Sequence, residues 1–220
     1  MKGENYGWEY FERRKSSYHA SAISSFALQV LGWAEKAGFP RLLNGKGKRA
    51  LDIGCAQGYV VEALRGRGYE SYGLDISPIL SGRLGFSAFQ ASWTHLPFQD
   101  EAFDLVTSFE VAEHLPSEEA LIQALREAFR VLKVGGSLII TTPALNPLNL
   151  LSDRLHREEH YVLRTAGWWK QTLTRFTGRV HIKTFNFIPM VRFPVRGRFL
   201  SAYAPRPLAR HLAVFAAKEN

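Results

Sequence analysis

Residues 51–58 carry the stretch Leu51-Asp52-Ile53-Gly54-Cys55-Ala56-Gln57-Gly58. The apolar run 49–53 predicts a short strand, and the apolar spacing in 58–67 predicts a helix, so this stretch is a strand-to-helix turn. Gly54 permits a sharp turn because it has no Cβ atom, and Gly58 allows close approach of a ligand and the following helix. Parallel α/β sheets bind ligands at such turns, beside the carboxyl ends of their strands. By itself, however, the pattern is a weak indicator of binding.

Strands and helices alternate from this turn to residue 143. We predict strands at 71–74, 87–90, 103–109 and 137–142, and helices or turns at 77–84 and 117–132. Ser117 is the expected N-cap of the last helix, and Gly135-Gly136 is expected to stop it. The alternation predicts an α/β fold, a doubly wound and mostly parallel sheet with helices on both faces.

The two ends of the chain depart from this rhythm. An amphipathic helix is predicted at 16–37, so we expect residues 1–45 to form an N-terminal helical cap or lid and 46–220 the main domain. Residues 144–165 are expected to be irregular and 166–177 helical. Two last strands are predicted at 180–187 and 211–217, with the proline-containing insert between them lying over the site.

A second acidic residue strengthens the interpretation of the turn. Asp75 ends the strand that follows, so its carboxylate is placed to accept hydrogen bonds from two ribose hydroxyls. The alternative is a turn or helix N-cap role before Ser77-Pro78. A nicotinamide-dependent enzyme fits less well, because Ala56 and Tyr59 stand where the G-x-G-x-x-G pattern needs its second and third glycines.

Six motifs occur in order between residues 49 and 143. They are Ala50–Gly58, Tyr72-Gly73-Leu74-Asp75, Leu96-Pro97-Phe98, Phe103–Ser108, Glu113-His114-Leu115 and Arg130–Gly136. In this combination the chain resembles class I S-adenosylmethionine-dependent methyltransferases, and most of all the small-molecule group that includes quinone-biosynthesis enzymes. The resemblance implies a Rossmann-like seven-stranded sheet whose last strand is antiparallel, and S-adenosyl-L-methionine as cofactor.

The resemblance also implies roles for individual residues. Asp52 would lie near the methionine amino group, Gly54 and Gly58 under the cofactor, Asp75 on the ribose and Ile76 on one face of the adenine. The remaining cofactor-binding candidates are Cys55, Ala56, Ser92, Trp93 and Phe109. Two positions depart from the family pattern: Ala56 stands for a frequent third glycine, and Ser92 for an aspartate that accepts from the adenine amino group. Trp93 is either a core residue or an adenine-stacking one.

The acceptor side is expected where Phe109 leads into the array Glu110, Glu113 and His114. His114 is a structural histidine, or else it is a general base for the acceptor, with Glu110 and His160 as the other catalytic candidates. A third interpretation is a divalent metal held by this array and His160, which would lower the pKa of an acceptor hydroxyl. We do not favour the metal and assign no metal ligand.

Charge and composition limit the kinds of partner that the chain can have. Residues 154–220 carry 13 basic and 3 acidic residues, which could attract a nucleic acid, a phosphorylated or carboxylated substrate or an anionic membrane surface, or could form a solvated surface without a partner. The expected small-molecule acceptor is anionic or aromatic. An RNA methyltransferase and a non-catalytic S-adenosylmethionine binder are therefore the alternative functions. No apolar run is long enough to cross a membrane, and a single cysteine forms no internal disulfide, so a cytoplasmic protein is expected. The sequence gives no oligomeric state.

Overall fold

A computed structural model describes residues 20–77, 87–156, 160–188, 200–203 and 209–220. The helices are α2 (Ala20–Lys36), α3 (Tyr59–Arg65), the 3-10 turn η3 (Ala112–His114), α4 (Glu118–Val131), α5 (Pro147–His156) and α6 (Ala166–Leu173). The strands are β1 (Arg49–Ile53), β2 (Glu70–Asp75), β3 (Ala88–Gln90), β4 (Phe103–Phe109), β5 (Leu132–Pro143), β6 (Val180–Ile188), β7 (Leu200–Tyr203) and β8 (His211–Ala217). The predicted helix or turn at 77–84 falls almost wholly outside the described residues.

All the strands belong to one sheet, in the order β3-β2-β1-β4-β5-β8-β6-β7. The first five pair in parallel, and β8 runs antiparallel to both β5 and β6. The predicted α/β class, with its mostly parallel sheet and antiparallel last strand, is confirmed. The prediction of seven strands missed an eighth, β7, which lies in the insert after β6 and pairs antiparallel with it.

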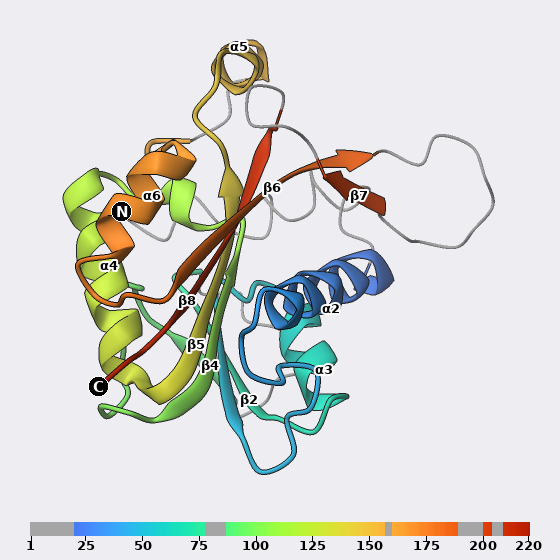
Figure 1. Cartoon of the computed structure of the whole chain (residues 1–220), viewed down its shortest axis with the longest axis vertical. Coiled ribbons are helices and arrows are strands. Elements are labelled where there is room, and N and C mark those ends of the chain that lie inside the picture. The colour runs from blue at the N-terminus through green and yellow to red at the C-terminus, as the bar shows by residue number, and fades with distance from the viewer. Residues whose placement is uncertain (1–19, 78–86, 157–159, 189–199, 204–208) are drawn as a thin grey trace.

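Helices cover both faces of the sheet (Figure 1). Successive residues of a strand point to opposite faces, so Ile139 of β5 packs in the core formed with α2 and α3, whereas Leu138 and Ile140 pack in the core formed with α4 and α6. Strands that are buried on both faces have nearly continuous apolar sequences. This explains why the apolar runs at 103–109 and 137–142 predicted the strands β4 and β5.

The turn from α4 into β5 corrects one prediction. The hydroxyl of Ser117 accepts a hydrogen bond from the N–H of Ala120 at 3.2 Å, as expected of the N-cap. The helix, however, already ends at Val131, and Gly135-Gly136 lie inside β5 rather than stopping α4. Gly135 adopts a positive φ of 79° there, at an irregularity in the pairing of β5 with β4. The glycines therefore bend a strand.

The prediction of an irregular segment at 144–165 was wrong for its first half. α5 occupies Pro147–His156, and its first residue is the proline whose missing N–H costs nothing at a helix start. The sequence hid this helix because Asn149 is buried while Leu148, Leu150 and Leu151 are exposed. An apolar stripe facing the core, which is the usual helical signal, is therefore absent from 147–151.

α2 packs directly on the sheet beside α3. Phe26 meets Phe109 of β4 edge to face, with ring centroids 6.0 Å apart, and Trp33 lies 5.3 Å from the ring of Phe185. The division of the chain into a cap at 1–45 and a domain at 46–220 stays a proposal, and residues 1–19 lie outside the described part. No helix among the described residues is long and apolar enough to cross a membrane.

Candidate functional site

The loop between β1 and α3 has an unusual backbone. Gly54, Ala56 and Gly58 all adopt positive φ, at 75°, 45° and 80°. Two features exclude a side chain at Gly54. Its positive φ disfavours any residue with a Cβ atom, and an added Cβ atom would lie only 2.3 Å from a methyl carbon of Val111. The glycine predicted for a sharp turn is therefore required, and the loop packs directly against the segment that follows β4.

Asp75 at the end of β2 is tied to this loop. Its two carboxylate oxygens accept the backbone N–H of Ala56 and the backbone N–H of Ser77, each at 2.8 Å. The side chain is only 8% exposed, and burial raises its pKa above the usual range of a carboxyl. The two interpretations from the sequence are thus compatible, because the carboxylate caps the turn at Ser77 and also faces the loop at residue 56.

Asp52 lies at the end of β1, one strand away from Asp75. It is 2% exposed and accepts a hydrogen bond from the hydroxyl of Thr107 at 2.7 Å. Burial raises the pKa of Asp52 to about 7; the Thr107 hydrogen bond opposes this rise and the charge of Asp75 adds to it. Burial likewise raises the pKa of the neighbouring Cys55 thiol, so Cys55 is an un-ionised, buried side chain.

Asp52 and Asp75 are buried without an ion-pair partner in the part of the chain that the structure describes. Among the described residues, no lysine, arginine or histidine forms an ion pair with Asp52 or Asp75. Buried carboxylates are normally paired or bound to a cation, because an unpaired buried charge is costly. The edge of the sheet at β1 and β2 is therefore electrostatically suited to a positively charged ligand.

The remaining cofactor candidates surround this edge at different depths. Ile76 directly follows Asp75 and is partly buried. The hydroxyl of Ser92 forms a hydrogen bond with that of Thr94 at 2.9 Å. Trp93 is 4% exposed in the main core, with no hydrogen-bond partner for its Nε1 among the described residues. Core packing, one of its two predicted roles, is therefore observed, and Phe109 is held by α2 through Phe26.

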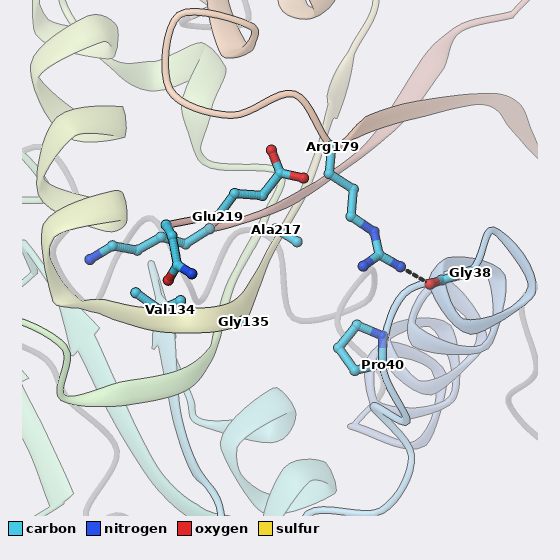
Figure 2. Close-up of a pocket in the computed structure, with 9 residues that line it drawn as sticks. Gly38, Pro40, Val134, Gly135, Arg179, Ala217 and Glu219 are labelled. Atoms are coloured by element: carbon cyan, nitrogen blue, oxygen red, sulfur yellow. Dashed lines mark hydrogen bonds between the residues drawn. The ribbon is translucent and has the colours of Figure 1, made fainter.

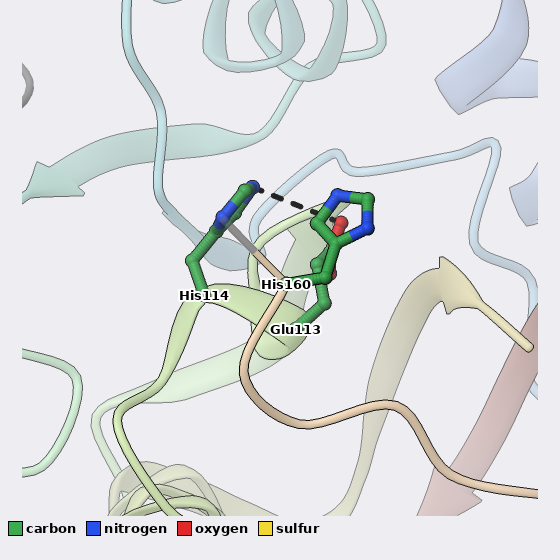
Figure 3. Close-up of side chains that lie close together, drawn as sticks. All are labelled: Glu113, His114 and His160. Atoms are coloured by element: carbon green, nitrogen blue, oxygen red, sulfur yellow. Dashed lines mark ion pairs between the residues drawn. The ribbon is translucent and has the colours of Figure 1, made fainter. Parts of the chain in front are cut away.

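Glu113, His114 and His160 come together after β4 (Figure 3). The segment 160–162, which we call the strap, is tied to η3. The backbone N–H groups of Tyr161 and Val162 donate to the carbonyl of Glu113, at 2.8 and 3.1 Å. The rings of His114 and His160 lie 5.2 Å apart, and one donor atom from each of the three residues lies within 4.8 Å of the others. Glu113 is 1% exposed, and its carboxylate accepts the hydroxyl of Thr142 at 3.1 Å.

Glu110 does not join this group. Its Oε2 lies 3.2 Å from Nδ1 of His211, the first residue of β8, and its backbone has a positive φ of 54°. Burial opposes ionisation of Glu110, but the charge and the hydrogen bond of His211 outweigh burial and hold its pKa below the usual range. The predicted array is thus divided into two clusters at the same edge of the sheet.

Comparison with known proteins fits this geometry. The family model described as "Methyltransferase domain" matches residues 51–140, which run from within β1 to within β5. The "Ubiquinone biosynthesis O-methyltransferase" of Psychrobacter arcticus is 32% identical over 130 residues, covering 54% of this chain and 49% of that protein. The protein of the same name from Pseudomonas fluorescens is 33% identical over 115 residues, covering 48% of each chain. The chain thus spans about half the length of these curated relatives.

Over residues 51–140 the chain is therefore similar to a methyltransferase domain in sequence. Solved structures share the fold of the whole chain. An S-adenosylmethionine-dependent methyltransferase from Thermotoga maritima superposes with a TM-score of 0.66 at 17% identity, covering 96% of this chain and all of that one. One from Archaeoglobus fulgidus gives 0.64 at 18% identity, with the same coverage. At these identities the likeness is one of fold.

Two polar residues at this edge of the sheet were not predicted from the sequence. Thr107, the partner of Asp52, lies directly beside it in the parallel pairing of β1 with β4. His211 lies opposite Pro143, where β5 ends and the antiparallel β8 begins. A signal for His211 existed, because an antiparallel last strand starts at the edge where the parallel strands finish.

The basic residues of the C-terminal third suggested an anionic partner. Arg192, Arg196, Arg198 and Arg206 lie outside the described residues. Arg210 is described, and its guanidinium donates to the side-chain oxygen of Asn149 at 3.0 Å. An expected nucleic-acid surface therefore stays a prediction.

A cavity of about 460 Å³ lies elsewhere, between the start of β5 and the end of β8 (Figure 2). It is lined by Gly38, Pro40, Val134, Gly135, Arg179, Ala217, Lys218, Glu219 and Asn220. The guanidinium of Arg179 donates to the carbonyl of Gly38 at its rim. Because β5 begins at this end, the cavity lies at the sheet edge opposite to Asp52 and Asp75, and it contains none of the predicted site residues.

Proposed function

We propose that this chain transfers a methyl group from S-adenosylmethionine to an oxygen atom of a small-molecule acceptor. The observation that carries the proposal is the pair of buried carboxylates Asp52 and Asp75, beside a loop of three positive-φ residues; the described part of the chain offers neither of them an ion-pair partner. The relatives named above are O-methyltransferases of ubiquinone biosynthesis, which supports an oxygen acceptor.

The two carboxylates fit the charge and the hydroxyl groups of the cofactor. S-adenosylmethionine supplies a methyl group on a positively charged sulfur and carries a positively charged amino group. Asp52 would face the amino group and Asp75 the ribose hydroxyls, since each carboxylate oxygen of Asp75 has a second lone pair beyond the backbone bond it accepts. Ile76, Ser92 and Trp93 are proposed around the adenine. Gly54, Cys55, Ala56, Gly58 and Phe109 are proposed to shape the rest of the site.

His114 and His160 are proposed as the proton-accepting group. An acceptor hydroxyl must lose its proton as the new O–C bond forms, and imidazole has a pKa suited to that transfer near neutral pH. The 5.2 Å separation of the two rings, and the strap hydrogen bonds that fix His160 to Glu113, support a joint role. Glu110 and His211 are proposed to form the opposite wall of the acceptor site.

The same three residues also form a donor set for a divalent ion. One carboxylate and two imidazoles suit zinc, manganese or iron, and such an ion would lower the pKa of an acceptor hydroxyl. Glu110, turned to His211, lies outside this set. We favour the metal-free alternative, and treatment with EDTA separates the two. Unchanged activity in EDTA leaves the histidines as bases, and loss restored by one specific metal assigns the ion.

Two measurements test the proposal. Titration calorimetry with S-adenosylhomocysteine is expected to show binding, which Asp75→Asn weakens and the exposed Glu70→Gln on the same strand does not. Transfer of labelled methyl from S-adenosylmethionine is then measured with catechol and alkyl-substituted catechols, with a primary amine and with total RNA. Product on a catechol oxygen supports the proposal, and product only on RNA or the amine contradicts it. If S-adenosylhomocysteine does not bind, the proposed cofactor site is wrong.

A further inference from the structure

A short polar turn follows β3 and carries three hydrogen-bonding side chains in four positions. Residues 92–95 form this turn, which is closed by a hydrogen bond from the backbone N–H of His95 to the carbonyl of Ser92 at 3.0 Å. Trp93 anchors the turn in the main core, where it is 4% exposed. Ser92 and Thr94 are half-buried and His95 is exposed. The turn is therefore fixed in place while its polar side chains stay accessible to a ligand.

The order of the strands places this turn beside the purine of the proposed cofactor. Asp52 ends β1, Asp75 ends β2, and β3 is the next strand outward. Gln90 at the end of β3 pairs with Asp75, and the N–H of Ala91 donates to the Asp75 carbonyl at 3.0 Å. With the amino group at β1 and the ribose at β2, the base continues toward β3. Ser92 is the first polar side chain beyond that strand.

The side chains of the turn are joined in a chain of hydrogen bonds. Oγ of Ser92 lies 2.9 Å from Oγ1 of Thr94, and Oγ1 of Thr94 lies 3.0 Å from Nδ1 of His95. The backbone N–H of Thr94 also donates to Oγ of Ser92 at 3.3 Å. Each hydroxyl has a single hydrogen to donate. The direction of this chain therefore decides whether Ser92 offers a ligand a hydrogen or a lone pair.

The imidazole at the end of the chain sets its direction. A neutral imidazole carries one hydrogen and accepts at its other nitrogen. The Nε2–H form is the more stable tautomer of an exposed neutral histidine, so Nδ1 of His95 accepts the hydroxyl of Thr94. Thr94 then has no hydrogen left for Ser92, and Ser92 must donate to Thr94. Oγ of Ser92 keeps one free lone pair and has no hydrogen left to donate.

We propose that Thr94 and His95 are positioning residues that make Ser92 an acceptor only, and that this selects adenine over a purine with a carbonyl at C6. The amino group at C6 of adenine donates, whereas the carbonyl of hypoxanthine accepts. A carbonyl facing the free lone pair of Ser92 leaves two acceptors without a hydrogen between them, which is costly in a partly buried site. The inference rests on the proposed function, because it assigns the base-selecting part of that cofactor site.

Titration calorimetry with two nucleosides tests the selection. S-inosylhomocysteine differs from S-adenosylhomocysteine only in the C6 group and the hydrogen at N1. Wild type is expected to bind the adenosyl compound about tenfold more tightly or better. Thr94→Val removes the hydroxyl and frees the Ser92 hydrogen to donate to the carbonyl, so binding of the inosyl compound should improve about fivefold. Thr94→Ser keeps a hydroxyl at the same position and, as the matched control, should retain the selectivity of wild type.

Two further variants change the acceptor itself or its support. Ser92→Asp replaces the hydroxyl by a charged group that only accepts, so the preference for the adenosyl compound should increase. His95→Ala leaves the Thr94 hydroxyl without its acceptor, so the preference should fall in the same direction as in Thr94→Val. A gain in binding of the inosyl compound separates a lost positioning role from a damaged fold, because damage weakens both ligands.

Nitrogen NMR of histidine-labelled wild type reads the tautomer directly and needs no variant of the turn. His95→Ala serves only to assign the signal. Near pH 8 the proposal requires the hydrogen on Nε2 of His95, and a hydrogen on Nδ1 overturns it. Equal binding of the two nucleosides to wild type, or unchanged selectivity in Thr94→Val, overturns it as well. Failure of the proposed function is distinct, since wild type would then bind neither compound, whereas tight binding of both without selectivity removes this inference alone.

Discussion

The backbone N–H of Ala56 donates to Oδ2 of Asp75 across 2.8 Å, and this one bond joins the β1 loop to the end of β2. The second carboxylate oxygen fixes the turn at Ser77. Both halves of the proposed cofactor site are therefore held by a single side chain, whose burial and backbone bonds fix its direction before any ligand arrives.

Asp75→Asn is expected to weaken binding of S-adenosylhomocysteine by about 10- to 100-fold, because the amide cannot accept two backbone N–H bonds and loses the charge that strengthens them. Titration calorimetry measures the loss, and Glu70→Gln on the same strand is the matched control. Affinity within twofold of wild type in Asp75→Asn would exclude the ribose role.

The pH dependence of stability should reveal Asp52. Its pKa of about 7 in the folded chain exceeds the value of about 3.9 expected when unfolded, so the folded chain holds the extra proton between these pH values. This contribution to the free energy of unfolding, a few kcal/mol at most, is complete below about pH 4 and is lost as the pH rises through 7. Thermal melts of wild type and Asp52→Asn from pH 5 to 8 measure it, and the difference between them should change across that window.

The same carboxylate should couple ligand binding to pH. A positively charged ligand binds the ionised form of Asp52, so affinity for S-adenosylhomocysteine, with its charged amino group, is expected to rise from pH 5.5 to 8. Calorimetry in buffers of different ionisation enthalpy should detect proton release on binding near pH 6.5. Asp52→Asn should bind more weakly and release no such proton, and equal proton release in both proteins would contradict the coupling.

Ala56→Gly should be tolerated or stabilising, although alanine-to-glycine changes usually destabilise. The φ of 45° at Ala56 costs a residue with a Cβ atom about 1 kcal/mol, which offsets the greater chain entropy of unfolded glycine. Ala63→Gly inside α3 is the matched control, with an expected loss of about 0.5–1 kcal/mol. Chemical denaturation of both variants compares them, and an equal loss at the two positions would show that the Ala56 backbone is unstrained.

Glu110→Gln is expected to lower the rate of methyl transfer about tenfold while leaving affinity for S-adenosylhomocysteine within twofold. The carboxylate that orients the imidazole of His211 is lost, and the proposed acceptor wall loosens. Glu101→Gln is the matched control, because Glu101 has the same φ of 54° and lies away from the site, where it pairs with Lys218. Equal rates of methyl transfer in wild type, Glu110→Gln and Glu101→Gln would show that the Glu110–His211 pair has only a structural role.

The sequence by itself determined the sheet and the cofactor edge. Alternating strand and helix patterns place Asp52 and Asp75 at the ends of neighbouring parallel strands, and a strand's end is a local property that spacing reveals. The sharp turn at Gly54 was likewise predicted, because it directly follows the end of a predicted strand. The tertiary structure alone decided which acceptor-side groups meet. His160 reaches His114 through a strap pinned to the Glu113 carbonyl, and His211 reaches Glu110 across 101 positions of sequence. Only packing could also turn the leucines of α5 outward, because the buried side chain of Asn149 donates to the backbone carbonyl of Arg210, 61 positions away in the sequence.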